Sequence, residues 1–304
     1  MIPLRSFLFV PGDSEKKLGK VDGCGADAVI LDLEDAVAPA NKDAARTLVA
    51  EFLRARPKAE RPLQIWVRVN PLGSGLTLAD LAAIVAVEPD GIVQPKTDGP
   101  DDVRTLSHYC DALEAQAGLE PGAIRILPVA TETARAPFSL GAFADAKLDR
   151  LAGLTWGAED LSAALCASGN RDADGTWAFT YRMVRSLTLM AAHAAGVPAI
   201  ETLHADFRDD EGLRATSRAA RAEGFTGRLA IHPAQVAGIN ESFTPGDEEV
   251  AFAARLITAF EAQPDAGTVG IDGKMYDIPH LKAARRTRAL HEAALHESRS
   301  AQDR

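Results

Sequence analysis

The segment AVILDLEDAVAP, residues 28–39, joins four consecutive apolar residues to a group of carboxylates. The acidic residues are Asp32, Glu34 and Asp35, and no basic residue lies beside them in the sequence to neutralise their charge. Carboxylates gathered in this way can bind a cation, hold its water ligands or transfer protons. The alternative is a structural role, in which Asp32 and Glu34 bond to a neighbouring strand.

Polar residues follow other apolar segments as well. Arg68 stands inside WVRVN, where an unpaired charge would be costly to bury, so we expect it to have a functional role. Glu132 in VATETARA and Asp160 in GAEDLSA are candidates for metal or substrate binding, whereas Glu159 is more typical of a helix N-terminus. The other polar residues at such positions are Asn70, Gln94, Lys96, Glu201, His204 and His232. For His204 and His232, packing and an active-site role stay open.

The carboxylates of these segments predict a divalent cation. Several carboxylates in one cavity raise each other's pKa, and a hard ion bound by one or two of them, with water and substrate, would relieve the repulsion. This favours Mg²⁺, with Mn²⁺ possible, over zinc, because the sequence has neither H-x-x-x-H nor H-E-x-x-H.

Eight short apolar segments alternate with amphipathic segments and predict a parallel sheet covered by helices. The apolar segments are residues 6–10, 28–33, 64–69, 91–95, 125–131, 153–157, 198–203 and 228–232. Eight such units favour a (β/α)8 TIM barrel over an open doubly wound sheet, and PGDSEKKLG after the first segment is not G-x-G-x-x-G. Functional groups of such a barrel lie at the C-terminal ends of its strands, where the polar residues above are found.

Residues 241–304 extend beyond the predicted barrel, which we assign to residues 1–240. The extension predicts a helix, a hairpin around GTVGIDGKMYD and a charged helix, and we expect it to pack on a neighbouring subunit.

Composition narrows the classes of function. The chain has 304 residues, 46% of them hydrophobic, and a formal net charge of -10, which argues against nucleic acid as a partner. Cys24, Cys110 and Cys166 are isolated and predict neither disulfides nor a thiolate zinc site. No apolar span approaches the ~20 residues needed to cross a bilayer, and no basic region precedes an apolar one at the N-terminus, so we expect a cytoplasmic protein without membrane contact.

Seven motifs together resemble the citrate lyase β-subunit-like branch of the HpcH/HpaI aldolase superfamily. In chain order they are RSFLFVPGDSEKKLGK, GADAVILDLEDAVAP, VRVN, ATETARA, GAEDLSA, LAIHPAQVAGIN and DGKMYDIPHLKAA. Relatives in this branch include malyl-CoA, citramalyl-CoA and citryl lyases. The resemblance implies a Mg²⁺-dependent barrel that makes or breaks a carbon–carbon bond between an acyl-CoA thioester and a small keto acid.

The resemblance also assigns roles. Glu132 and Asp160 match the metal ligands, Arg68 matches the residue that binds a substrate oxygen, and Glu34 and Asp35 match an acidic pair that holds metal-bound water.

Four further residues match positions outside this group. Lys16, Lys17 and Lys20 lie in the loop that faces CoA, where a helix N-terminus agrees with phosphate binding, although an ordinary helix with solvated lysines is the alternative. Asp277 matches an acid that reaches a neighbour's site, which implies a homo-oligomer, expected to be a trimer.

The segments IETLHAD, with Glu201 and His204, and ALCASGNRDADGTW depart from the family pattern and leave the substrate open. Three alternatives to a lyase remain at this point. These are a malyl-CoA-type thioesterase, the β subunit of a citrate lyase complex acting on an acyl-carrier-bound citryl group, and a catalytically silent scaffold.

Overall fold

The computed structural model describes residues 4–302, with side chains up to residue 294. Eight parallel strands form one sheet in the order β5-β4-β3-β2-β1-β8-β7-β6. Their bounds are β1 Ser6–Pro11, β2 Ala28–Asp32, β3 Gln64–Arg68, β4 Gly91–Gln94, β5 Arg125–Pro128, β6 Leu154–Thr155, β7 Ala199–Glu201 and β8 Gly227–Ala230.

The two outer strands of this order, β5 and β6, meet through isolated parallel bridges. Val129 pairs with Thr155, and the backbone N–H of Ala130 donates to the Thr155 carbonyl at 2.9 Å. These bridges bring the ends of the sheet together, so the predicted (β/α)8 barrel is confirmed.

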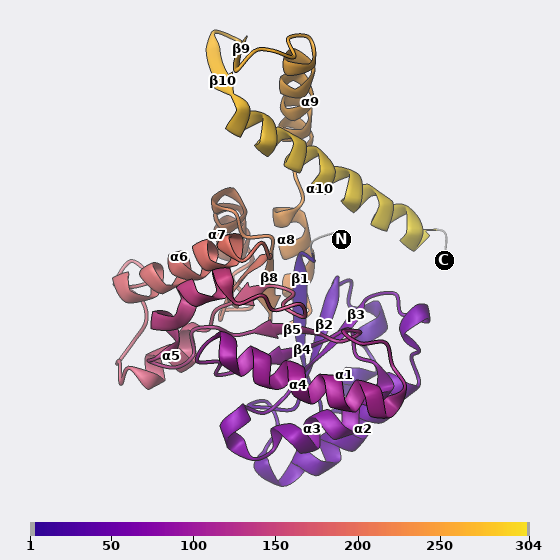
Figure 1. Ribbon diagram of the computed structural model, residues 1–304. Coiled ribbons are helices and arrows are strands. Elements are labelled where there is room, and N and C mark those ends of the chain that lie inside the picture. Colours follow the sequence, from indigo (N-terminus) through magenta and orange to yellow (C-terminus); the bar gives the residue numbers. More distant parts are fainter. Residues whose placement is uncertain (1–3, 303–304) are drawn as a thin grey trace. The chain divides into compact units, whose positions relative to one another are not determined.

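Helices surround the strands (Figure 1). They are α1 Glu15–Leu18, α2 Lys42–Arg54, α3 Thr77–Ile84, α4 Pro100–Ala117, α5 Ala158–Ala164, α6 Phe179–Ala194, α7 Asp210–Glu223 and α8 Ala234–Phe243. Short 3-10 segments cover Val21–Gly23, Pro39–Asn41, Lys58–Glu60, Leu72–Ser74, Val85–Val87 and Ala136–Asp145. The last of these takes the place of an α-helix between β5 and β6, where the sequence predicts a helix. None of the helices in the described part of the chain is long and apolar enough to cross a membrane.

The barrel interior is filled by alternate residues of the strands. Nine buried side chains form this core: Phe7, Ala28, Ile30, Trp66, Val93, Leu127, Val129, Ile200 and Leu229. Gly91 is required beside it, because a Cβ at this position would lie 2.2 Å from the Trp66 ring. Since successive strand residues point to opposite faces, Asp32 and Arg68 share the inward face with Ile30 and Trp66.

Residues 4–240 form one compact unit, and a second unit begins at Glu241. The second unit contains α9 Asp247–Glu261, β9 Thr268–Ile271, β10 Lys274–Asp277 and α10 Ile278–Gln302. The two strands form an antiparallel hairpin whose Asp272-Gly273 turn has two positive φ angles, 52° and 75°, which is the two-residue turn that such sequences favour. Residues of α9, β9 and α10 form its own apolar core: Ala253, Leu256, Ile257, Phe260, Val269, Ile271, Leu281 and Ala284.

Candidate active site

Arg68 and Asp32 lie at the C-terminal ends of adjacent strands and pair directly in the β2–β3 register. Arg68 donates from Nε and NH2 to the two carboxylate oxygens of Asp32 at 2.8 and 2.7 Å, and its NH1 lies 2.9 Å from Oε2 of Glu34. Burial opposes the positive charge, but the hydrogen bonds and charge of Asp32 raise the pKa of Arg68 above its ordinary value. The guanidinium is therefore fixed in place and stays charged.

Asp32 also shapes the turn that carries the other two acidic residues. Its carboxylate accepts the backbone N–H of Glu34 at 2.9 Å and that of Ala36 at 3.1 Å. From the outer side, the ammonium of Lys42 donates to the Leu33 and Glu34 carbonyls, both at 2.7 Å. The turn is thus held from both sides, which fixes the position of the Glu34 side chain.

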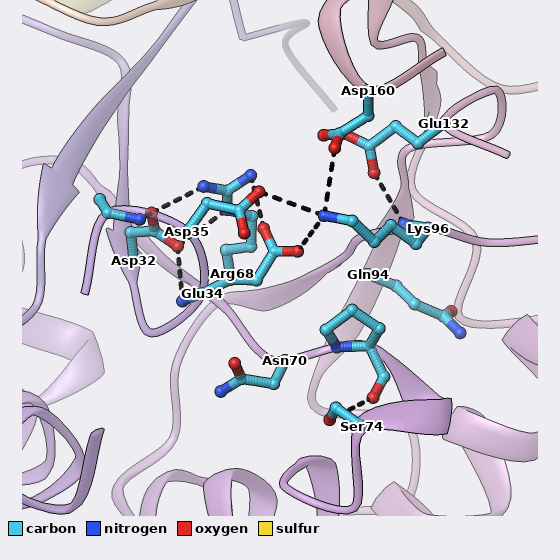
Figure 2. Close-up of polar contacts among 12 residues, drawn as sticks. Asp32, Glu34, Asp35, Arg68, Asn70, Ser74, Gln94, Lys96, Glu132 and Asp160 are labelled. Atoms are coloured by element: carbon cyan, nitrogen blue, oxygen red, sulfur yellow. Dashed lines mark hydrogen bonds and ion pairs between the residues drawn. The ribbon is translucent and has the colours of Figure 1, made fainter. Parts of the chain in front are cut away.

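Lys96, two residues after β4, is the central cation of the site (Figure 2). Its Nζ lies 2.5 Å from Glu34 Oε1, 3.1 Å from Asp35 Oδ2 and 3.5 Å from Asp160 Oδ1. Its backbone has a positive φ of 49°, a conformation that is uncommon outside glycine, and its N–H donates to Glu132 Oε2 at 2.7 Å. The side chain and backbone of this one residue thus connect the acidic turn after β2 with both predicted metal ligands.

Glu132 is almost completely buried, at 7% exposure. Its pKa is raised to about 8, mainly by burial and also by the negative charges of Asp160 and Glu34. The hydrogen bond from the Lys96 backbone N–H acts in the opposite direction. Gly157 makes room for this carboxylate, because a Cβ there would lie 2.8 Å from Glu132 Cγ and 2.9 Å from Oε1. Asp160 follows in the first turn of α5 and is 33% exposed.

Burial raises the pKa of Glu34 despite the nearby charges of Arg68 and Lys96. Asp35 is more exposed, and the hydrogen bond and charge of Lys96 outweigh its desolvation and lower its pKa.

Asp32, Arg68, Glu132 and Asp160 line a cavity of about 280 Å³, whereas Glu34, Asp35 and Lys96 are not among its lining residues. Its lining includes Phe9, Lys17, Asp32, Arg68, Val129, Glu132, Trp156, Gly157, Asp160, Thr202 and Leu203. We use the name carboxylate cluster for Asp32, Glu34, Asp35, Glu132 and Asp160.

The carboxylate cluster fits a divalent cation. Arg68 and Lys96 are the cations that contact it through the ion pairs above, and they leave the five carboxylates under-neutralised when all are ionised. The space that Gly157 leaves lies against the Glu132 carboxylate. No group of three or more His, Cys, Asp or Glu side chains is arranged as a complete metal site within the described residues, so a metal here would use Glu132 and Asp160 with ligands that are not side chains.

The site brings together Glu34, Asp35, Arg68, Glu132 and Asp160 as the sequence predicts, although their roles stay predictions. Of the three candidate lysines, which are all exposed, only Lys17 is among the residues that line the cavity. Asp277 belongs to the unit that begins at Glu241, where the hydrogen bond from His280 lowers its pKa.

Two features of the site were not predicted from the sequence. The sequence shows no positive charge beside the acidic segment, but Arg68 and Lys96 come from β3 and the β4 loop to contact it, so a metal is not its only source of neutralisation. The sequence also assigns no role to Lys96 beyond its position at a strand end, because the left-handed backbone that aims it at the cluster has no sequence signal.

Glu201 lies on the outward face of β7, next to the inward Ile200. Its carboxylate accepts hydrogen bonds from Trp156 Nε1 at 2.6 Å, Arg185 Nε at 2.6 Å and its neighbour's N–H at 2.9 Å. It is therefore a structural anchor between the barrel and α6.

Comparison with known proteins gives consistent matches. The family model described as HpcH/HpaI aldolase/citrate lyase matches residues 5–233. The mitochondrial citramalyl-CoA lyase of Rattus norvegicus is 34% identical over 299 residues, which cover 93% of this chain and 84% of that protein. The (3S)-malyl-CoA thioesterase of Cereibacter sphaeroides strain KD131 is 36% identical over 293 residues, which cover 96% of this chain and 95% of that protein.

A solved structure matches over nearly the whole chain. It is the protein CitE of Mycobacterium tuberculosis in complex with magnesium, acetoacetate and coenzyme A, with a TM-score of 0.77 and 32% identity. The match covers 95% of this chain and 98% of CitE.

Proposed function

Because the chain belongs to the HpcH/HpaI aldolase/citrate lyase family, we propose that it is a Mg²⁺-dependent carbon–carbon lyase that cleaves or forms a 3-hydroxyacyl-CoA thioester. The observation that carries the proposal is the cavity in which Arg68, Glu132 and Asp160 meet at the C-terminal ends of the barrel strands. The citramalyl-CoA lyase relative and the magnesium, acetoacetate and coenzyme A bound to CitE support the reaction class, the metal and the substrates.

Cleavage in this class breaks the bond between the hydroxyl-bearing carbon and the carbon next to the thioester. The hydroxyl loses a proton and becomes the carbonyl of the keto acid, while the electron pair forms the enolate of the acyl-CoA, which then takes up a proton. Mg²⁺, when bound by Glu132 and Asp160, would fix the oxygen atoms of the hydroxy acid and stabilise their negative charge.

The chain's own residues supply the remaining functions. Arg68, which Asp32 holds charged and rigid, lines the cavity and would stabilise negative charge on a substrate oxygen. Glu34 and Asp35 would position water beside the metal site. Lys17, at the cavity, is the lysine best placed to meet a phosphate of CoA, and Lys16 and Lys20 would add to the positive charge near it.

Asp277 would supply the proton to the enolate carbon from the second unit of an adjacent subunit. This requires a closed homo-oligomer, which we propose to be a trimer in which each site takes Asp277 from its neighbour.

Product analysis tests the reaction. The purified protein is incubated with Mg²⁺ and with malyl-CoA, citramalyl-CoA and citryl-CoA, and the products are identified by mass. A lyase releases a keto acid and a shorter acyl-CoA, and EDTA, Glu132→Ala and Asp160→Ala each abolish this release while circular dichroism shows a folded barrel. Full activity in EDTA would refute the metal assignment.

Thioester hydrolysis is the second candidate because the match to the (3S)-malyl-CoA thioesterase spans nearly the whole chain at 36% identity. In that case the same incubations release a free hydroxy acid and CoA, with no keto acid.

A further inference from the structure

A second cavity of about 670 Å³ lies outside the barrel interior, within the unit of residues 4–240. It is lined by residues from the loop before α6, from α6, from the β7–α7 loop, from α7 and from β8, including Arg171, Trp177, Arg185, Leu203, Thr216 and Arg228. Thr202 and Leu203 line both this cavity and the catalytic one. Its volume is in the range that holds small organic ligands.

Arg228 is the unusual group in this cavity. It follows Gly227 in β8 on the face opposite the inward Leu229, and it is only 4% exposed. Its NH1 donates to Thr216 Oγ1 at 3.0 Å, but its Nε has no hydrogen-bond partner. Within the described residues no carboxylate forms an ion pair with it, so this is a nearly fully buried cation without a counter-ion.

Glu201 is the carboxylate whose charge attracts Arg228, but its oxygens are already occupied. They accept from Trp156, Arg185 and the Thr202 N–H, so Glu201 attracts Arg228 without bonding to it. Burial, together with the positive charges of Arg185 and Arg171, lowers the pKa of Arg228 to about 10 despite the Glu201 charge. A buried charge of this kind destabilises a fold unless a partner compensates it.

Arg171 supplies a second positive charge at the exposed side of the cavity. Its guanidinium stacks on the Trp177 ring at 3.8 Å and donates to the Gly175 carbonyl at 2.8 Å. The acidic residues that also line the cavity have partners of their own, since Glu223 binds Arg185, Asp174 binds Thr176, Asp206 accepts the Arg208 N–H and Asp209 binds Gly212 and His204.

From this geometry we infer that the cavity between α6 and α7 binds a small organic anion whose carboxylate or phosphate contacts Arg228. A guanidinium donates two parallel hydrogen bonds to such a group, whose oxygen atoms accept them. Arg171 adds attraction at the entrance, and the Trp177 ring and Leu203 contact the apolar part of the ligand. This site is separate from the carboxylate cluster and does not depend on the proposed lyase reaction.

Thermal unfolding of the full chain tests the inference, with inorganic phosphate and succinate as probes. The measurements are made in EDTA at constant ionic strength set with chloride, and isothermal titration calorimetry gives the dissociation constants. We expect the wild-type Tm to rise with the concentration of at least one probe, because ligand binding to the folded state stabilises it. A response to phosphate alone indicates a phosphate ester as the natural ligand, and a response to succinate alone indicates a carboxylate.

Arg228→Met should weaken binding of the responding probe at least about tenfold, because it removes the charge-assisted hydrogen bonds to the anion. Arg171→Gln should weaken it severalfold and leaves the buried part of the cavity intact. The matched control is Arg61→Met, which removes a similarly buried arginine that is paired with Asp90; it should lower Tm but keep the probe response.

In Arg228→Met the catalytic cavity is unchanged, and the salts still have their general effect on stability. Only the part of the Tm response that this variant loses therefore counts as binding at the new site. If the variant does not fold, Arg171→Gln and Arg228→Lys, which keeps the charge without the planar fork, carry the test, and both should weaken binding. No response of the wild type to either probe, or equal affinity in the wild type and the arginine variants, would overturn the inference.

Discussion

Replacing Lys96 with methionine tests whether one ammonium group sets the electrostatic balance of the carboxylate cluster. The ammonium lies 2.5 Å from Glu34 Oε1, 3.1 Å from Asp35 Oδ2 and 3.5 Å from Asp160 Oδ1. Methionine is unbranched like lysine and one atom shorter, and it keeps the backbone N–H that binds Glu132, so the substitution removes mainly the charged group.

The expected loss of stability follows from these contacts. Hydrogen bonds to charged groups contribute about 1.5–3 kcal/mol and exposed ion pairs about 0–1 kcal/mol. Since the Lys96 side chain is 30% exposed, solvent screens part of the interaction, and we expect the metal-free variant to lose about 2 kcal/mol. For a barrel of this size, that loss lowers Tm by about 4–8 °C.

Magnesium should narrow the difference in stability between the variant and the wild type. The Lys96 ammonium lies beside Asp160 and repels any cation held there. Its removal should therefore tighten Mg²⁺ binding on the order of tenfold. At an effective dielectric of about 20, the repulsion between neighbouring charges is large enough to account for a change of this size. Thermal unfolding in EDTA and in a MgCl₂ series at constant ionic strength, with calorimetric titration, measures both effects.

Lys58→Met is the matched control, because Lys58 donates to the Ala123 carbonyl rather than to a carboxylate. It should leave the magnesium response unchanged. If Lys96→Met and the wild type have equal Tm in EDTA and equal Mg²⁺ affinity, Lys96 is not the counter-ion of the cluster.

Three further predictions concern the same site. Arg68→Lys should lower kcat nearly as much as Arg68→Ala, because a lysine cannot reproduce the two parallel hydrogen bonds of a guanidinium, and a variant that keeps most of the wild-type kcat would contradict this. Gly157→Ala should weaken both Mg²⁺ affinity and activity because its methyl group would overlap Glu132, whereas Gly141→Ala, whose Cβ meets nothing within 4 Å, should change neither. Co-expression of inactive Asp277→Ala and Glu132→Ala chains should restore part of the activity if sites are shared between subunits; verified mixed oligomers that stay inactive would exclude a shared site.

The strands were predictable because both of their faces are buried, which produces continuous apolar segments. Residues 28–33 and 64–69 were expected as strands and form β2 Ala28–Asp32 and β3 Gln64–Arg68. The prediction was poorer near the closure of the barrel, where the expected strand at 153–157 is reduced to Leu154–Thr155 and isolated bridges replace a full ladder. The hydrophobic pattern indicates burial there, but it carries no information on how the sheet closes.

The family relationship was also predicted from the motifs and is confirmed by the match over residues 5–233. The roles of the site residues, the trimer and the cytoplasmic location stay predictions.

The site was predictable in composition but not in its pairing. Arg68 and Asp32 are 36 residues apart and meet because the β2–β3 register places them opposite each other, which the sequence does not specify. Lys96 contacts the cluster from a left-handed backbone conformation, for which the sequence gives no signal.

Side-chain alternation decides which of the polar residues near strand ends face the catalytic cavity. Asp32 and Arg68 share the inward face with Ile30 and Trp66, so they line that cavity, whereas Glu201 is next to the inward Ile200 and points outward. The same alternation turns Arg228 away from the barrel interior and toward α7, where Thr216 is its hydrogen-bond partner. The inward-facing Asp32 and Arg68 therefore line the catalytic cavity, and the outward-facing Glu201 and Arg228 of β7 and β8 line the proposed anion site.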